Sequence, residues 1–345
     1  MTPLKKTLHN RVNRGELKKR ALESSIPRTT LSFYTYAHLP EPEAFRDRFY
    51  QALSQMGVLG RIYVAREGVN AQISVPTSRL AELTDYFNTI PFLAHLRLNI
   101  AIEDDGKSFF TLAIKVKDRI VADGIEADDF DVTKSGPHLS AAEFNALTSD
   151  PETIVVDMRN HYESEVGHFE NAILPAMETF REGLPLVAEM LKDKSEKNIV
   201  MYCTGGIRCE KASAYMKYRG YKNVYQLDGG IIEYARQTAL QGLPNKFIGK
   251  NFVFDERLGE RISDDVISTC HQCGVPNDHH TNCANDACHL LFIQCESCGD
   301  QYEGCCSIQC RDFKNLPEET RKELRKSITF HGTHHSKSKP GMLRN

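Results

Sequence analysis

Hydrophobic and polar positions along residues 29–125 follow a pattern that switches between alternation and helical spacing. The runs that predict strands are rich in β-branched and aromatic residues: LSFYTYAHL, GRIYVAR, VNAQISV, LRLNIAI and FFTLAIKVK. Large apolar residues recur at helical spacing in EAFRDRFYQALSQMG and, after Pro76, in SRLAELTDYFNTI. GRIYVAR and VNAQISV are separated by Glu67-Gly68, which predicts a hairpin turn. The predicted order is β-α-β-β-α-β.

Residues 126–243 have a different rhythm, in which short, continuously apolar runs alternate with amphipathic segments. The runs TIVVDM, NIVMYC and NVYQL predict strands, and ETFREGLPLVAEMLK, EKASAYMKYRG and GIIEYARQTAL predict the helices between and after them. Strands without alternation are buried on both faces, so this segment predicts an α/β domain with a parallel sheet.

A chain of 345 residues is long enough for two or three domains. We expect a basic arm over 1–28, a ferredoxin-like α+β domain over 29–125 and an α/β domain over 126–243. A linker around Gly242 to Lys250 then leads into a cysteine-rich region and basic tail over 244–345.

Charge is distributed unevenly, although the net formal charge is only −3. Lys and Arg outnumber acidic residues by six in 1–28 and by five in 311–345, so the middle carries −14. This excludes a uniformly basic protein that coats nucleic acid. The N-terminal arm is either a solvated basic segment or a contact for RNA phosphates, through Lys5, Lys6, Arg11, Arg14, Lys18, Lys19 and Arg20.

No apolar run approaches the roughly 18 to 20 residues that a membrane helix needs. The first twenty residues also lack the apolar block of a signal peptide. We therefore expect no membrane partner and a cytoplasmic location, where the 11 cysteines stay reduced and either bind metal or take part in chemistry.

One cysteine has the setting of a reactive group. NIVMYC ends at Cys203 and is followed by a loop of Thr204, Gly205, Gly206 and Ile207. Ligands bind at the carboxyl ends of strands in open parallel sheets. The glycines allow NH groups to turn inward, and the next helix adds its positive dipole end. We expect this cradle to hold Cys203 as a thiolate, with a pKa below about 8.5, and to stabilise a persulfide on it.

Four residues separate Cys203 from Arg208, one fewer than in phosphatases that use a cysteine nucleophile. The smaller ring suits a sulfur atom. The fixed charge of Arg208 would stabilise the thiolate or an anionic substrate group. The alternative is a structural cysteine on a tight turn. Cys209 is predicted to be an inward-facing residue in the first turn of the helix, although it could also resolve a persulfide as a disulfide.

Nine cysteines crowd into residues 270–310. Eight of them form closely spaced pairs: Cys270 and Cys273, Cys283 and Cys288, Cys295 and Cys298, Cys306 and Cys310. Four pairs are enough for two tetrahedral zinc sites, and closed all-thiolate sites are structural. A small segment with few large apolar residues needs such cross-links to fold. An iron-sulfur cluster and a redox relay of cysteines are the alternatives.

We expect the pairs to combine in chain order, with 270 and 273 joining 283 and 288, and 295 and 298 joining 306 and 310. The alternative is a cross-brace, in which the first pair joins the third and the second joins the fourth. His271 or His289 could replace a cysteine in either arrangement, and Cys305 is left over. Ser307 is placed to cap the helix that carries the last ligand.

The motifs VVDMRN, VGHFENAI, CTGGIR and NVYQLDGGI resemble the rhodanese domain. That resemblance implies an α/β domain whose loop cysteine, here Cys203, takes up a sulfane sulfur. It also implies that Asp157 and Arg159, which match the family's first-strand pair, support the active-site region as a structural ion pair.

Three parts in this order resemble the bacterial tRNA uridine hydroxylase family over roughly residues 30 to 320. They contain GRIYVAREGVNAQISV, CTGGIRCEK and CHLLFIQCESCGDQYEGCCSIQC. The resemblance implies an enzyme that carries out oxygen-dependent 5-hydroxylation of the wobble uridine of tRNA and requires Cys203. Molecular oxygen is then a co-substrate and tRNA the partner. The sequence shows no evident iron-ligand triad, dinucleotide fingerprint or haem motif. Oxygen activation is therefore implied by the family resemblance and not by the residues themselves.

Two other functions fit the same residues. A sulfurtransferase would pass a persulfide sulfur from Cys203 to tRNA or to a small acceptor. A binding module would have an inactive rhodanese fold and a zinc region that recruits partners, but inactive rhodanese domains usually lose the loop cysteine.

Overall fold

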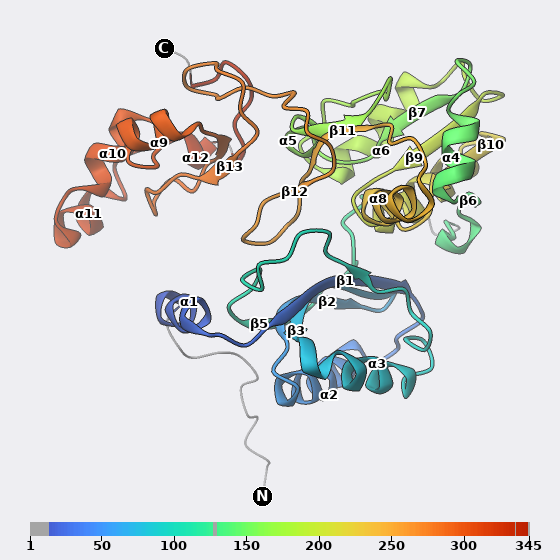
Figure 1. The fold of residues 1–345 in the computed structure, drawn as a ribbon, viewed down its shortest axis with the longest axis horizontal. Helices are drawn as coiled ribbons and strands as arrows, with labels where there is room; N and C mark the ends of the chain where they lie inside the picture. Colours follow the sequence, from blue (N-terminus) through green and yellow to red (C-terminus); the bar gives the residue numbers. More distant parts are fainter. Residues whose placement is uncertain (1–13, 127–129, 335, 344–345) are drawn as a thin grey trace, which may run out of the picture. The chain divides into compact units, whose positions relative to one another are not determined.

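The computed structural model describes residues 14–126, 130–334 and 336–343 (Figure 1). Its contacts group them into two compact units. The first unit holds the described residues up to 160 together with 171–246 and 253–257. The second holds 161–170, 247–252 and the described residues from 258 onward. Among the described residues, no helix is both long and apolar enough to cross a bilayer.

The first unit opens with helix α1 (Arg14–Glu23) and an antiparallel sheet of strands β1 (Arg28–Tyr36), β2 (Leu59–Ala65), β3 (Gly68–Pro76) and β4 (Asn99–Ile100). The full strand order is β4-β1-β3-β2-β5, where β5 (Leu112–Val116) adds an edge strand parallel to β2. Helices α2 (Pro42–Gln55) and α3 (Leu80–Asn88) lie on one face, and the 3₁₀ turn η1 (Thr77–Arg79) precedes α3 (Figure 1). The predicted β-α-β-β-α-β order is confirmed, and the two predicted runs after α3 both form strands, LRLNIAI as β4 and FFTLAIKVK as β5.

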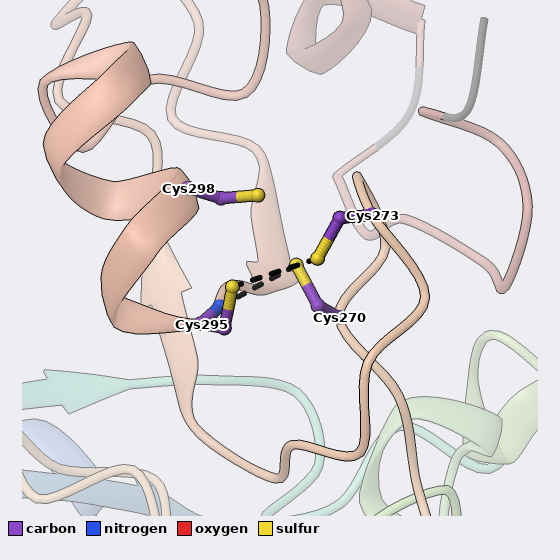
Figure 2. Close-up of side chains that lie close together, drawn as sticks. All are labelled: Cys270, Cys273, Cys295 and Cys298. Carbon is purple, nitrogen blue, oxygen red and sulfur yellow. Dashed lines mark hydrogen bonds between the residues drawn. The ribbon is translucent and has the colours of Figure 1, made fainter.

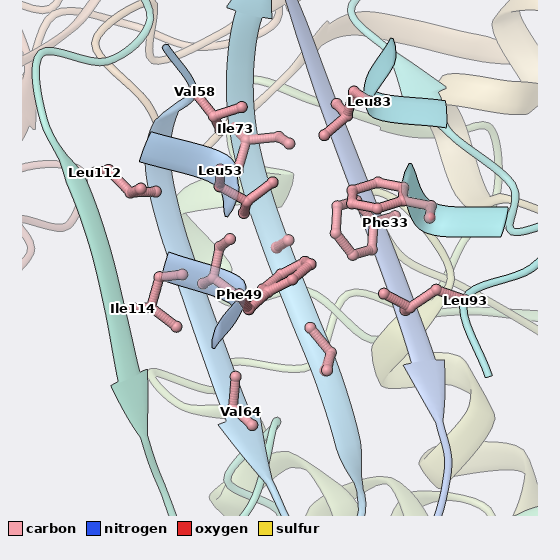
Figure 3. Close-up of a cluster of buried hydrophobic side chains, with 14 of the residues drawn as sticks. Phe33, Phe49, Leu53, Val58, Val64, Ile73, Leu83, Leu93, Leu112 and Ile114 are labelled. Carbon is pink, nitrogen blue, oxygen red and sulfur yellow. The ribbon is translucent and has the colours of Figure 1, made fainter. Parts of the chain in front are cut away.

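The core of this sheet lies between its inner face and the two helices (Figure 3). Phe33 from β1, Phe49 from α2 and Ile73 from β3 are almost completely buried. The ring of Phe33 packs edge-on against Phe87 of α3, with centroids 4.9 Å apart. Burying each such side chain contributes roughly 1.5 to 3 kcal/mol, so the alternating pattern of the sequence accounts for the fold of this half.

The parallel sheet predicted for the central segment is present. Its strands are β6 (His138–Leu139), β7 (Ile154–Asp157), β9 (Asn198–Tyr202) and β10 (Asn223–Leu227), in the order β6-β10-β9-β7. The associated helices are α4 (Ala141–Leu147), α6 (Phe180–Met190), α7 (Ile207–Tyr218) and α8 (Gly230–Gln241), with the 3₁₀ turn η2 (Val132–Lys134) before β6. The predicted α/β class is therefore confirmed.

The second unit contains a three-stranded sheet, a hairpin and short helices. Helix α5 (His161–Ser164) precedes β8 (Gly167–Phe169), which pairs antiparallel with β11 (Phe247–Asn251), and β11 pairs with β12 (Glu260–Arg261). Strands β13 (His280–Asn282) and β14 (Leu291–Ile293) form the hairpin. The helices are α9 (Glu296–Tyr302), α10 (Ile308–Lys314), α11 (Glu318–Leu324) and α12 (His331–His334). Residues 161–170 thus pair with strands far along the chain, and the four-segment division stays a prediction.

Candidate active site and metal centres

Cys203 directly follows β9, at the carboxyl end of the parallel sheet. Its side chain is completely buried, and the backbone NH of Gly206 donates to its sulfur at 3.2 Å. Helix α7 begins at Ile207, slightly earlier than the sequence suggested, with Gly206 as its N-cap residue. The sulfur therefore lies at the start of a helix, inside a loop whose NH groups stabilise negative charge.

The surroundings of Cys203 favour a thiolate. Burial raises the pKa of its thiol, but a hydrogen bond from Cys209, the charge of Arg208 and the backbone NH groups of Arg208 and Gly206 outweigh burial. Together they lower the pKa to about 6. Below that pH the thiol is protonated, and above it the thiolate predominates, so a nucleophile is available at neutral pH.

Two glycines allow the loop to close around the cysteine. Gly206 has φ +99°, and a Cβ at this position would lie 2.8 Å from the hydroxyl of Tyr34. Gly230, at the start of α8, has φ +66°, and a Cβ there would lie 2.5 Å from the carbonyl oxygen of Cys203. The left-handed backbone and the lack of space both require glycine at these positions. A Cβ at Gly230 would also lie 2.7 Å from the backbone nitrogen of Gly205, so the Gly-Gly pairs of CTGGIR and LDGG are in close contact.

Arg208 is 9% exposed and follows the cysteine loop in the first turn of α7. Its Nη2 lies 3.4 Å from Thr204 Oγ1, and its guanidinium carbon lies 5.8 Å from the ring centre of Phe254. The carbonyl of Ile207 accepts from the hydroxyl of Tyr36 at 3.2 Å. The predicted cradle of Thr204 to Ile207 therefore has a side-chain contact at each end, from Arg208 to Thr204 and from Tyr36 to Ile207. The catalytic role of Arg208 stays a prediction.

Cys209 faces inward from the first turn of α7 and is completely buried, as predicted. Burial and the neighbouring charge of Cys203 raise the pKa of Cys209 well above its ordinary value. Cys209 therefore stays protonated and donates to the Cys203 thiolate, which is one reason why the two thiols differ in acidity.

Asp157 and Arg159 form a buried ion pair at the end of β7, and both side chains have zero exposure. Arg159 Nη2 lies 2.7 Å from Asp157 Oδ2, and the backbone NH of Arg159 donates to Asp157 Oδ1 at 2.9 Å. The guanidinium also lies 5.7 Å from the ring centre of Tyr202, the last residue of β9 before Cys203. This geometry fits the supporting role that the rhodanese resemblance implies.

We expect Asp157→Asn to lower the free energy of unfolding by about 3 to 5 kcal/mol, because it removes a buried carboxylate that pairs with a buried guanidinium. Urea denaturation measures this loss. Glu196→Gln is the matched control, because it breaks an ion pair with Lys222 in which both side chains are about 70% exposed. The control should change the free energy by no more than about 1 kcal/mol. Equal stability of the two variants would contradict the structural role.

A second buried charge cluster was not predicted. Lys211 of α7 is 1% exposed, and its Nζ donates to both carboxylate oxygens of Glu67 at 2.9 and 3.0 Å. It also donates to Asp123 and to the carbonyl of Val121. Glu67 lies in the turn between β2 and β3, which the register places at Arg66 and Glu67, one residue earlier than predicted. Nothing in the sequence marks this lysine as buried.

A cavity of about 220 Å³ lies beside the cysteine loop, lined by Tyr34, Arg97, Asn99, Gly205, Asp228 and Gly229. Arg97 donates to both carboxylate oxygens of Asp228 at 2.5 and 2.6 Å. Arg97 and Asn99 were not predicted as site residues, because the run LRLNIAI that contains them shows only strand character. Asp228 and Gly229 belong to the LDGG motif, which was the available signal.

The eight paired cysteines form two groups of four, in which the sulfur atoms of each group lie within 4.8 Å of one another. Figure 2 shows the first group, where Cys295 and Cys298 come from the start of α9 and Cys270 and Cys273 from a loop. The second group holds Cys283, Cys288, Cys306 and Cys310. The expected combination in chain order is therefore wrong, and the cross-brace is present.

The hairpin β13–β14 explains this arrangement. Register pairs His280 with Ile293 and Asn282 with Leu291, so the two strands run antiparallel. Residues before β13 therefore lie beside residues after β14, while Cys283 and Cys288 meet at the opposite end, where the turn is. Each end of the hairpin holds one group, and combining neighbours in chain order would require sulfurs from both ends.

The sulfur positions suit a tetrahedral metal. Four ligands at about 2.3 Å from zinc place the sulfurs about 3.8 Å apart. The observed distances are 3.6 Å between Cys273 and Cys295, 3.8 Å between Cys288 and Cys306, and 3.7 Å between Cys306 and Cys310. The thiolate set and its spacing therefore fit zinc.

The remaining expectations for this region concern single residues. Ser307 caps α10, since its hydroxyl accepts from the backbone NH of Cys310 at 3.2 Å, as predicted. His271 and His289 are outside both groups of four, and His271 instead bonds Glu165 at 2.7 Å. Cys305 is buried and is not part of either group.

Three family models match consecutive parts of the chain. The UPF0176 acylphosphatase like domain matches residues 28–120, the rhodanese-like domain matches residues 140–237 and the rhodanase C-terminal model matches residues 248–311. The second of these matches includes both β9 and the Cys203 loop.

Curated relatives match nearly the whole chain. A protein named tRNA uridine(34) hydroxylase from Pectobacterium atrosepticum is 61% identical over 319 residues, which cover 92% of this chain and 90% of that protein. A protein of the same name from Photorhabdus laumondii is 59% identical, over 92% of this chain and 91% of its own length. At this identity and coverage, the chain belongs to the tRNA uridine(34) hydroxylase family.

Proposed function

We propose that this protein is an enzyme that hydroxylates carbon 5 of the wobble uridine of tRNA, with O₂ as co-substrate and Cys203 at the reacting centre. The observation that carries the proposal is a buried thiolate, with a pKa of about 6, in an NH cradle at the carboxyl end of β9. The names of the relatives support uridine 34 of tRNA as the substrate.

The stoichiometry of hydroxylation by O₂ determines which co-reactants are needed. Insertion of one oxygen atom of O₂ into the C5–H bond leaves the other atom to be reduced to water. That reduction takes two electrons and two protons, which a dithiol supplies when it is oxidised to a disulfide. Within this scheme Cys203 provides the thiolate nucleophile and Arg208 the fixed positive charge that keeps it ionised.

We also propose that the protein binds two zinc ions. The two groups of four cysteines would hold one ion each, and closed all-thiolate sites supply folding energy and leave no position open for a substrate. The zinc sites would therefore shape the C-terminal unit, while the chemistry takes place at the Cys203 loop. A tRNA substrate supports a cytoplasmic location.

Nucleoside analysis of total tRNA tests the function directly. Cells that contain the protein should yield 5-hydroxyuridine or a nucleoside derived from it, and cells without the gene should lack it. A sulfur-containing nucleoside that disappears in its place would support transfer of a persulfide sulfur from Cys203. Identical nucleoside profiles in both strains would contradict both functions.

The basic N-terminal arm is proposed to contact tRNA phosphates. Lys5, Lys6 and Arg11 lie outside the described residues, while Lys18, Lys19 and Arg20 lie on α1. Lys19 is 75% exposed, and its contact with Glu23 is long, at 3.9 Å, so its charge is available.

Neutralising Lys5, Lys6, Lys18 and Lys19 together should weaken tRNA binding and flatten its salt dependence. Each lost phosphate contact reduces the slope of log affinity against log salt by about 0.7 to 0.9. Binding titrations at several salt concentrations measure this. A variant with Lys192→Gln and Lys222→Gln, two exposed lysines elsewhere, is the control and should keep the wild-type slope. An unchanged slope in the arm variant would make the arm a solvated segment.

A further inference from the structure

Asn99 of β4 lies at the wall of the 220 Å³ cavity and has one side-chain hydrogen bond among the described residues. Its side chain is 4% exposed, and its Nδ2 donates to the carbonyl of Gly205 at 3.4 Å. Its Oδ1 is buried and accepts no hydrogen bond from the part of the chain that the structure describes. A buried acceptor without a partner costs about 1 to 3 kcal/mol, and native proteins rarely leave such a group unsatisfied unless a ligand or water uses it.

Asn99 lines this cavity, and its amide combines one acceptor with one donor. Oδ1 is a buried acceptor without a partner among the described residues, and Nδ2 carries two hydrogens, of which one is donated to Gly205. An acceptor beside a donor complements the Watson–Crick edge of uracil, where the N3–H donor lies between two carbonyl acceptors. The cavity volume exceeds that of a pyrimidine base, and Tyr34 adds an aromatic ring to its wall, as is common where proteins hold unpaired RNA bases.

The cavity is also placed correctly for the chemistry. Gly205 lines it, and the next residue, Gly206, donates its NH to the sulfur of Cys203. Gly229 lines it as well, and the neighbouring Gly230 packs against the carbonyl of Cys203. A base in this cavity would therefore lie against the loop that carries the thiolate.

We propose that the cavity binds the uracil base of an unpaired nucleotide, and that Asn99 selects uracil by accepting a hydrogen bond from its N3–H. This inference rests on the proposed function for its substrate class. It assigns base selection to the ferredoxin-like half of the first unit and the reactive thiolate to the rhodanese half. Cytosine is rejected, because its N3 carries a lone pair in place of a hydrogen and would face the oxygen of Asn99.

The test measures binding of the full-length protein to anticodon stem–loop RNAs that carry uridine, 3-methyluridine or cytidine at the wobble position. Methylation of N3 removes the donated hydrogen. Loss of such a contact to a base weakens binding about tenfold or more, so wild-type protein should prefer uridine over both other RNAs by that factor. Asn99→Ala should bind the uridine RNA more weakly and should no longer distinguish it from the 3-methyluridine RNA.

Asn70→Ala is the matched control. Asn70 lies on β3 of the same sheet, its amide donates to the carbonyl of Ile120 at 3.2 Å, and it is not among the residues that line the cavity. This variant should keep the wild-type preference. The comparison of uridine with 3-methyluridine uses wild-type protein, so it remains decisive even if Asn99→Ala fails to fold.

Hydroxylation is measured on the same RNAs to separate the two proposals. Hydroxylation of the uridine RNA by a protein that binds the uridine and 3-methyluridine RNAs equally would overturn the role of Asn99 and leave the enzymatic function standing. A preference for uridine that is lost in Asn99→Ala, without any hydroxylation, would uphold the pocket and overturn the function. Absence of binding to all three RNAs would overturn both.

Discussion

Cys203→Ser is expected to abolish 5-hydroxylation of tRNA while leaving the protein folded. Serine has nearly the same volume as cysteine and fits the completely buried site, but its hydroxyl does not ionise at neutral pH. Loss of the thiolate therefore removes the nucleophile without opening a cavity in the core. Nucleoside analysis of tRNA incubated with each protein measures the activity, and thermal unfolding confirms the fold. Substantial hydroxylation by the folded variant would contradict the assignment of Cys203.

The pH dependence of the wild-type enzyme provides a second measure of the same group. Because the pKa of Cys203 is about 6, activity should rise with pH through that value as the thiolate forms. The rise should not be delayed to the pKa of an ordinary thiol, about 8.5. A midpoint near that ordinary value would show that the loop does not stabilise the thiolate.

Cys209→Ser is the comparison variant and should be milder. Its hydroxyl can still donate to the Cys203 thiolate, and Arg208 and the backbone NH groups continue to lower the pKa. The variant should therefore retain activity, with its pH profile close to that of the wild type. If it proves as inactive as Cys203→Ser, both cysteines take part in the reaction as a relay.

Removal of zinc is expected to unfold the C-terminal unit before the parallel sheet loses its structure. The purified protein should contain about two zinc ions per chain. Thiolate sites of this kind contribute apparent binding free energies of roughly 10 to 16 kcal/mol in small zinc domains, more than a small core supplies. Hydrogen exchange with and without a chelator measures the loss, peptide by peptide.

Peptides from the hairpin β13–β14 and from α9 and α10 should lose protection first. Peptides from β9 and α7 serve as the internal control, because they contain none of the eight ligands, and they should stay protected. Iron and a visible chromophore in the purified protein would reverse the zinc assignment and would place a redox centre in this unit.

Local sequence signals predicted much of the fold and of the cysteine loop. Strand and helix periodicity is a property of neighbouring residues, so the β-α-β-β-α-β order and the parallel sheet were visible in the pattern. The position of Cys203 followed for the same reason, since the strand, the glycines and the helix start are consecutive. Capping of α10 by Ser307 also depends only on residues three positions apart.

Contacts between distant segments were not predictable in the same way. The cross-brace depends on the antiparallel register of β13 and β14, which brings Cys270 beside Cys295. Pairing of β8 with β11 joins residues about eighty positions apart. Asn99 lies in a strand of only two residues, and its proposed role depends on its contact with Gly205. No local pattern connects these two residues, which are far apart in the sequence.

The buried lysine of α7 has a consequence for how the protein can be divided experimentally. Lys211 finds its counter-charges in Glu67 and Asp123, which come from the segment before the parallel sheet. A fragment that begins after residue 126 would retain the lysine, lose both carboxylates and expose the surface of α7 that the deleted segment contacts. Such a truncated rhodanese segment should be destabilised at α7, the helix that begins beside Cys203. Failure of that fragment to react would therefore say nothing about the chemistry of the intact chain.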